Sequence, residues 1–338
     1  MSFRRPLTLI AVAVLLAAAT TVPAKTVPRA PYQYFRVGNP NNVHVSTRPG
    51  FALIGGGKDL DAAFQWLCER SGGGDFLILR ASGTDAYNAY IKSLCREKSI
   101  ATLVIPTRQA AMDSFVKRAI DGAAAIFIAG GDQSNYINFW SSTPVEAAIN
   151  RAIRRGVPLG GTSAGLAVLG EFAYSAQNDS SNGPNLNSPA ALADPFNRQV
   201  VTVRNFLAIP ALSGIITDTH FHGRDRLGRL LVFMARILQS GNVKRIRGIG
   251  IDQHTAFLLD PDGQGVVAGT GAVYFFEVSK MPAVCRPGMP LAFAGISVRK
   301  LVSDGRFNLR AWSGDGPRYM LSVDSGAVRS TQLGGDIY

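Results

Sequence analysis

The sequence has little that could bind a metal or span a membrane. Its three cysteines, Cys68, Cys95 and Cys285, are far apart and lack the spacing of zinc ligands, and its four histidines form no His-x-x-x-His pattern. Beyond the first 24 residues, no apolar stretch approaches the roughly 20 residues that cross a bilayer. We therefore expect no metal, no cofactor and no stable membrane span once a signal peptide is removed.

Runs of basic residues and repetitive polar tracts are also absent, although the 338 residues carry a formal net charge of +12. The excess charge is dispersed and is not interleaved with aromatic residues, so it does not indicate nucleic-acid binding. Two interpretations of the basic surface stay open: it attracts an anionic substrate or cell surface, or it serves solubility alone.

The N-terminus has the layout of a signal peptide. Arg4 and Arg5 precede the apolar run 7–19, and small residues follow up to Ala24. The run is shorter than a membrane span, so we expect residues 1–24 to be cleaved and the protein to be secreted or periplasmic; an uncleaved anchor is the alternative. Residues 25–48, with three prolines, are predicted to be an extended leader. In an oxidising compartment Cys68 and Cys95 could pair, which the sequence alone does not decide.

Residues 49–338 are predicted to form a single catalytic domain. Short apolar runs alternate with amphipathic stretches, which is typical of a parallel sheet covered by helices on both faces. After residue 243 the pattern changes to short β runs, so we expect a three-layer α/β/α fold, mostly parallel, with a β-rich C-terminal part. The predicted strands are 51–54, 76–79, 101–105, 125–129, 157–160, 215–216, 249–251, 256–259, 266–267, 273–278 and 291–298, and the predicted helices are 60–70, 87–97, 110–120, 144–155, one from about 166, and 227–238.

A serine stands where a nucleophile would be expected. Gly161-Thr-Ser163-Ala-Gly165 lies between a predicted strand and a predicted helix, and a tight turn of this kind exposes a serine hydroxyl beside free backbone amides. By itself the pattern is weak, because a glycine turn with an ordinary helix-capping serine looks the same.

A histidine and arginine cluster follows the strand that ends near residue 216. His220 is placed to take a proton from Ser163, since both follow strands whose carboxyl ends meet at one sheet edge. Arg224, Arg226 and Arg229 could bind substrate carboxylates, or could form only a solvated face. His222 is interpreted as a bystander.

Two further segments belong to the same predicted edge. Gly130-Gly131-Asp132-Gln133 lets a ligand approach the backbone and offers the Gln133 amide, although a plain turn is the rival interpretation. We expect the oxyanion to be bound by the Gly131 and Ala164 amides. The polar loop 178–195 is long enough to be a lid or a binding loop.

These motifs, in this order, resemble the cyanophycinases and aspartyl dipeptidases, a family of serine peptidases. The resemblance runs from about Phe51 to Leu259 and includes the segment 250–256, Gly-Ile-Asp-Gln-His-Thr-Ala. It implies a fold laid out like class I glutamine amidotransferases, Ser163 as nucleophile and His220 as base. It also implies that Gln133, Asp218, Arg224, Arg226 and Arg229 contact the substrate, which in cyanophycinases is a poly-aspartate chain carrying arginine.

One residue departs from the family pattern. Gln253 stands where the family has the glutamate of the triad, and a glutamine can orient the imidazole but cannot stabilise its cation. Asp252 and Asp218 are the nearby acids that could replace it. We expect an acyl-enzyme on Ser163 that releases β-aspartyl-arginine dipeptides. Another aspartyl dipeptidase or peptidase, or a binding homologue without turnover, stays open, as does a homodimer.

Overall fold

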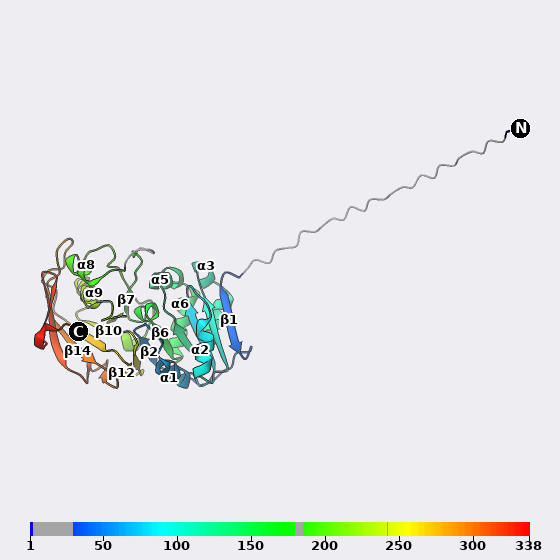
Figure 1. The fold of residues 1–338 in the computed structure, drawn as a ribbon, viewed down its shortest axis with the longest axis horizontal. Coiled ribbons are helices and arrows are strands. Elements are labelled where there is room, and N and C mark those ends of the chain that lie inside the picture. Colours follow the sequence, from blue (N-terminus) through cyan, green and yellow to red (C-terminus); the bar gives the residue numbers. More distant parts are fainter. Residues whose placement is uncertain (3–29, 180–184, 242) are drawn as a thin grey trace. The chain divides into compact units, whose positions relative to one another are not determined.

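The computed structural model describes residues 1–2, 30–179, 185–241 and 243–338, and Pro31–Tyr338 form one compact unit (Figure 1). The expected signal peptide lies outside the described residues apart from its first two. Among the helices of the described part, none has the length and apolar character needed to cross a membrane.

The first sheet has ten strands, and its centre is parallel. Strands β4, β3, β5, β6 and β2 run parallel to one another in that spatial order, and antiparallel strands extend the sheet at both edges. Strands β15 (Arg306–Asn308) and β16 (Ser313–Gly314) form one edge. The remaining strands are β1 (Gln33–Gly38), β2 (Phe51–Ile54), β3 (Asp75–Arg80), β4 (Ser99–Val104), β5 (Ala125–Ile128), β6 (Leu159–Thr162), β11 (Thr255–Leu259) and β12 (Gln264–Gly269).

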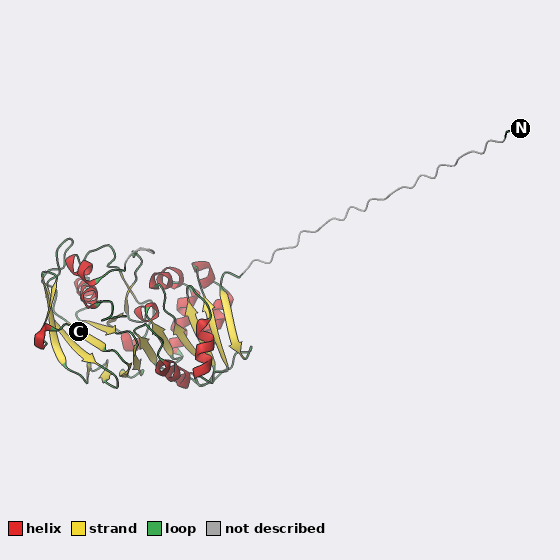
Figure 2. Cartoon of the chain, in the orientation of Figure 1, coloured by secondary structure: helices red, strands yellow, loops and turns green. Residues whose placement is uncertain are grey.

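Helices cover both faces of this sheet, because its buried strands are apolar on both sides. Phe76 and Ile78 of β3 pack in one cluster with α1 and α2, while Leu77 and Leu79 pack in another with α3 to α6. The three-layer α/β/α arrangement is therefore confirmed for this part of the chain (Figure 2). The helices are α1 (Asp61–Ser71), α2 (Ala86–Leu94), α3 (Arg108–Ala111), α4 (Ser114–Asp121), α5 (Gln133–Trp140) and α6 (Pro144–Arg154).

A second sheet of eight strands holds most of the C-terminal part. Only β7, β9 and β10 are parallel in it; the other pairs are antiparallel. Helix α9 (Leu227–Gln239) packs its apolar face against this sheet, and α8 (Ser188–Ala193) packs on α9. The strands are β7 (Phe172–Tyr174), β8 (Thr202–Arg204), β9 (Ile215–Asp218), β10 (Ile246–Ile251), β13 (Val273–Val278), β14 (Phe293–Leu301), β17 (Arg318–Asp324) and β18 (Ala327–Ser330).

The described fold differs from the prediction in several segments. Residues 33–38 were expected in a leader outside the domain, but they form β1, whose backbone pairs with the edge strand β4. The predicted helix 110–120 is two helices, because the Asp113 side chain accepts a hydrogen bond from the Phe115 amide and starts α4 afresh. Helix α7 (Ala164–Ala167) is a single turn, and the predicted loop 178–195 contains α8.

Cys68 of α1 and Cys95, just after α2, form a disulfide, so the pairing that the sequence left open is present. It joins the two helices that cover one face of the first sheet. Cys285 is free and buried.

Candidate active site

Ser163 lies on a sharp bend between β6 and α7. Its backbone is in the left-handed region, with φ 52°, which costs free energy for a residue with a side chain and is common at functional sites. The flanking glycines are required by space. A Cβ on Gly165 would lie 2.1 Å from the Ile128 carbonyl oxygen, and one on Gly161 would lie 2.6 Å from the Gly165 carbonyl oxygen. The bend thus presents the hydroxyl at the carboxyl end of β6.

His220 follows β9 in the second sheet, again with a positive φ, 46°. Its backbone N–H donates to the Gly55 carbonyl, 2.8 Å away, at the end of β2 in the first sheet. The imidazole lies directly over Gly56, where a Cβ would approach the ring to 2.5 Å. The Gly55–Gly57 turn therefore supports the imidazole, a contact that the sequence did not predict.

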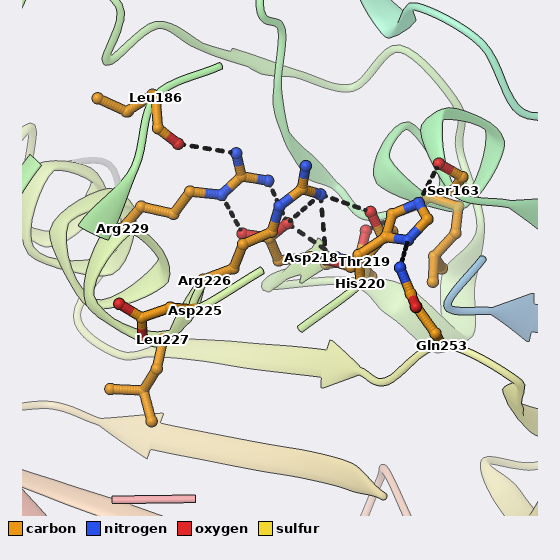
Figure 3. Close-up of polar contacts among 12 residues, drawn as sticks. Ser163, Leu186, Asp218, Thr219, His220, Asp225, Arg226, Leu227, Arg229 and Gln253 are labelled. Atoms are coloured by element: carbon orange, nitrogen blue, oxygen red, sulfur yellow. Dashed lines mark hydrogen bonds and ion pairs between the residues drawn. The ribbon is translucent and has the colours of Figure 1, made fainter. Parts of the chain in front are cut away.

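The two side chains meet as expected. The Ser163 Oγ lies 2.7 Å from His220 Nε2, and the Gln253 Nε2 lies 2.7 Å from His220 Nδ1 (Figure 3). Ser163, His220 and Gln253 come from β6, the end of β9 and the β10–β11 connection, so three distant segments are brought into one line of hydrogen bonds.

The surroundings of His220 favour the neutral imidazole. Burial and, to a smaller extent, the positive charges of Arg224 and Arg226 lower the pKa of His220 from 6.5 to about 3. A neutral imidazole can accept the serine proton, so His220 is in the protonation state that a base requires at neutral pH.

The Gln253 amide controls which nitrogen of His220 carries the proton. With Nε2 of the amide facing Nδ1, the amide donates, and the ring proton sits on the nitrogen beside Ser163. With the amide rotated, Oε1 accepts from Nδ1–H and leaves His220 Nε2 free to act as a base. The oxygen and nitrogen of an amide are assigned from hydrogen bonding, so both orientations fit the same side-chain position.

Neither nearby aspartate replaces the missing glutamate. The Asp252 carboxylate accepts hydrogen bonds from the backbone N–H groups of His222 and Ala272, and so points into the fold. The Asp218 carboxylate binds Arg229 through two hydrogen bonds, of 2.8 Å to Nε and 2.5 Å to Nη2.

The arginine cluster divides into a buried and an exposed part. Arg229 and Asp218 are each only 2% exposed, so the pair has no face open to a substrate. Arg226 is also buried and donates to the Thr219 carbonyl and hydroxyl (Figure 3). These three residues were predicted to contact the substrate directly, but their side chains hold the turn that carries His220.

Arg224 is the exposed member of the cluster. Among the described residues its guanidinium has no hydrogen-bond or ion-pair partner, although it is close enough to His220 to lower the imidazole pKa. Gln133, the first residue of α5, is half-buried and its amide is likewise without a partner in the described part of the chain. Both side chains are open to a ligand, and their contact with a substrate stays a prediction.

The two amides expected to bind an oxyanion lie near Ser163. Ala164 is the next residue and begins α7, and Gly130, which precedes Gly131, would contact the Ser163 Cβ at 3.4 Å if it carried a side chain. Within the described ranges, neither the Gly131 nor the Ala164 N–H has an acceptor, so both can donate to a bound group.

Tyr338 packs against the turn that follows His220, a contact that no sequence pattern indicated. The Tyr338 hydroxyl accepts a hydrogen bond from the Leu227 amide and donates to Asp225, and its ring stacks on His222. His222 is thus placed against Tyr338, away from the Ser163–His220 pair.

Comparison with known proteins identifies the family. The model of peptidase family S51 matches residues 53–193. A cyanophycinase from Geminocystis herdmanii (strain PCC 6308) is 32% identical over 219 residues, which cover 60% of this chain and 73% of the relative. The chain belongs to peptidase family S51. This S51 peptidase is also 28% identical over 286 residues to a cyanophycinase from Nostoc sp. (strain PCC 7120), covering 78% of this chain and 87% of that one.

Among solved structures, a peptidase from an acI-B1 Actinobacterium is similar at 18% sequence identity and a TM-score of 0.49. The match covers 78% of this chain and 98% of the Actinobacterium chain. The family consists of serine-type peptidases, which agrees with the resemblance found in the motifs.

Proposed function

We propose that this S51 peptidase is exported and hydrolyses a cyanophycin-type aspartyl polymer to β-aspartyl-arginine dipeptides through an acyl-enzyme on Ser163. The observation that carries the proposal is the 2.7 Å contact between the Ser163 hydroxyl and the neutral imidazole of His220. A serine hydroxyl becomes a useful nucleophile only when a base of this kind is within hydrogen-bond reach.

The reaction proceeds in two halves. Ser163 Oγ attacks the substrate carbonyl as its proton moves to His220 Nε2, and the Gly131 and Ala164 amides bind the oxyanion. The imidazolium then gives this proton to the leaving amine, and the acyl-enzyme remains. Water attacks the ester, its proton passes through His220 to Ser163 Oγ, and the free acid leaves.

Gln253 acts in this scheme with its carbonyl oxygen toward His220 Nδ1. The amide then fixes the tautomer in which Nε2 is the acceptor, but it carries no charge to stabilise the imidazolium. During turnover the His220 imidazolium therefore has only the neutral Gln253 amide at Nδ1, and it lies close to the positive charge of Arg224.

Two features support the substrate and the compartment. The exposed guanidinium of Arg224 beside His220 suits a substrate with free carboxylates, and relatives at 28–32% identity are named cyanophycinases. The Cys68–Cys95 disulfide fits an oxidising compartment, in agreement with the signal-peptide layout of residues 1–24.

Labelling with a fluorophosphonate, followed by a hydrolysis assay on cyanophycin granules and on Asp-X dipeptides, tests the proposal. We expect the label to map to Ser163, and both Ser163→Ala and His220→Ala to lose about 10⁴-fold or more in turnover. His222→Ala is the matched control, because this exposed histidine lies in the same turn and should keep both label and activity. A label found on another serine, or full activity in Ser163→Ala, would contradict the mechanism.

A second candidate is a binding protein without turnover. It is favoured by the Gln253 Nε2 that faces His220 Nδ1, since this orientation puts the ring proton on the wrong nitrogen. Binding of cyanophycin by the wild type with no dipeptide release would support it, whereas release from Asp-X dipeptides alone would indicate an aspartyl dipeptidase.

A further inference from the structure

The Cys68–Cys95 disulfide lies in a surface cavity well away from Ser163. The cavity has a volume of about 390 Å³, and both cysteines line it together with Glu69 and Glu97. Cys68 is half-buried, whereas Cys95 is 7% exposed. A small thiol entering the cavity would therefore reach the Cys68 sulfur first, and Cys95 would be the sulfur that leaves.

Glu97 is a buried acid beside this disulfide. One of its carboxyl oxygens lies within 4.8 Å of both sulfurs, and the residue is only 2% exposed. In the described part of the chain its Oε2 has no hydrogen-bond partner, which is costly for a buried polar atom. The nearby charged groups are Lys92, whose ammonium donates to the backbone carbonyl of Glu97 and lowers the carboxyl pKa, and Asp75, which raises it.

The Ser71 hydroxyl connects Glu97 to the end of α1. It accepts from the Gly73 amide and lies 2.7 Å from both the Cys68 carbonyl and Glu97 Oε1. Its one hydrogen can be donated to either oxygen. When it is donated to the Cys68 carbonyl, the contact with Glu97 is a hydrogen bond only if the carboxyl is protonated and donates. Burial also raises the pKa of Glu97 from 4.5 to about 7.

We propose that Cys68–Cys95 is a thiol–disulfide exchange site for a small thiol, and that Glu97 is its acid–base group. A thiolate attacks Cys68 Sγ, the bond between the two cysteines breaks, and Cys95 leaves as a thiolate that takes the proton of Glu97. A second thiolate then attacks the mixed disulfide, releases the disulfide of the small thiol, and leaves Cys68 reduced. Disulfide formation is the reverse, with the Glu97 carboxylate taking the Cys95 proton.

The leaving sulfur explains why an acid is needed at this position. A thiolate buried in apolar surroundings is unstable, so Cys95 must be protonated as it leaves. Once protonated, its S–H has an acceptor ready, because the Phe64 carbonyl oxygen lies 3.9 Å from the sulfur. The reaction needs only the thiol itself as reductant.

The pH profile of reduction by dithiothreitol tests the proposal on the intact folded chain. Thiolate attack rises about tenfold per pH unit below the thiol pKa of about 8.5. In the wild type we expect this rise to flatten above pH 7, where Glu97 loses its proton. Glu97→Gln should rise without that break and should be about tenfold slower at pH 6. Alkylation of the released Cys68 and Cys95 thiols, followed by mass spectrometry, gives the rate of reduction. The free thiol of buried Cys285 is present throughout and adds the same background to every sample.

Two features make the experiment decisive. A glutamine at residue 97 can keep the contact with Ser71 Oγ through its carbonyl oxygen or its amide group, so the local fold is kept, and a melting curve checks this. Glu69→Gln is the matched control, because Glu69 lines the same cavity but is exposed, and it should keep the wild-type profile. The same profile in Glu97→Gln and wild type, or no reduction before unfolding, would overturn the proposal.

Discussion

Two buried carboxyl groups of this protein, Asp218 and Glu97, differ in their partners. Asp218 ends β9 and is bound by the fork of Arg229. Glu97 follows α2 and has a hydroxyl and two sulfurs around its carboxyl; burial raises its pKa from 4.5 to about 7, although the charge of Lys92 lowers it. The comparison shows that the partners of a buried carboxyl, and not burial alone, set its charge.

Removing the cation should break this comparison most strongly. Arg229→Met removes both hydrogen bonds to the buried Asp218 carboxylate and leaves it only the 3.7 Å ion pair with Arg226, so we expect a loss of about 3 kcal/mol in the free energy of unfolding, measured with urea. The double variant Asp218→Asn/Arg229→Met should regain most of the loss. Arg236→Met is the control, since this arginine lies on the same helix but contacts the Pro195 carbonyl and the Phe196 ring and no carboxylate that the structure describes. A loss below 1 kcal/mol in Arg229→Met would contradict the assignment.

At Glu97 the expected effect appears in the pH dependence of stability. Folding raises the Glu97 pKa from 4.5 to about 7, so its stabilising effect is complete below pH 4.5 and is lost as the pH rises through 7. Glu97→Gln has no such loss. Between pH 4.5 and 7.5 the difference in unfolding free energy, variant minus wild type, should therefore increase by on the order of 3 kcal/mol. Parallel curves for the two proteins would show that Glu97 is ionised in the fold.

A third test adds a carboxylate where the site has none. Gln253→Glu places a negative charge beside His220 Nδ1, which should raise the imidazole pKa above its present value of about 3. We expect kcat/KM for the proposed cyanophycin substrate to rise about 100-fold, about 2.7 kcal/mol, and the acid limb of the pH profile to move to higher pH. Gln253→Leu, which can neither donate nor accept, should lose activity instead. A fall in both variants would mean that the amide is required.

The sequence predicted the parts of the site that depend on topology. Strand and helix periodicity placed Ser163 and His220 at strand ends, as found, but the expectation that both ends share one sheet edge is wrong, because β6 and β9 belong to different sheets. The partners of the arginines could not be predicted this way. Arg224, Arg226 and Arg229 look equivalent in the sequence, and only the direction of each side chain on the turn and on α9 separates the exposed guanidinium from the buried ones.

Contacts between distant segments explain the other differences. The strand β1 was missed because a proline-rich stretch pairs with β4 through backbone groups alone, which leave no side-chain pattern. The support of His220 by Gly56 and of the 220–227 turn by Tyr338 likewise depends on residues that lie more than 100 positions away. The break between α3 and α4 had a readable signal, since Asp113 is a favoured capping residue.

The hydroxyl and the imidazole belong to different sheets, since β6 lies in the ten-stranded one and β9 in the eight-stranded one. A chain in which either sheet is still unformed therefore lacks the contact between the Ser163 hydroxyl and the His220 imidazole. The contact between hydroxyl and imidazole therefore requires both sheets to be formed and packed together, whichever of them folds first.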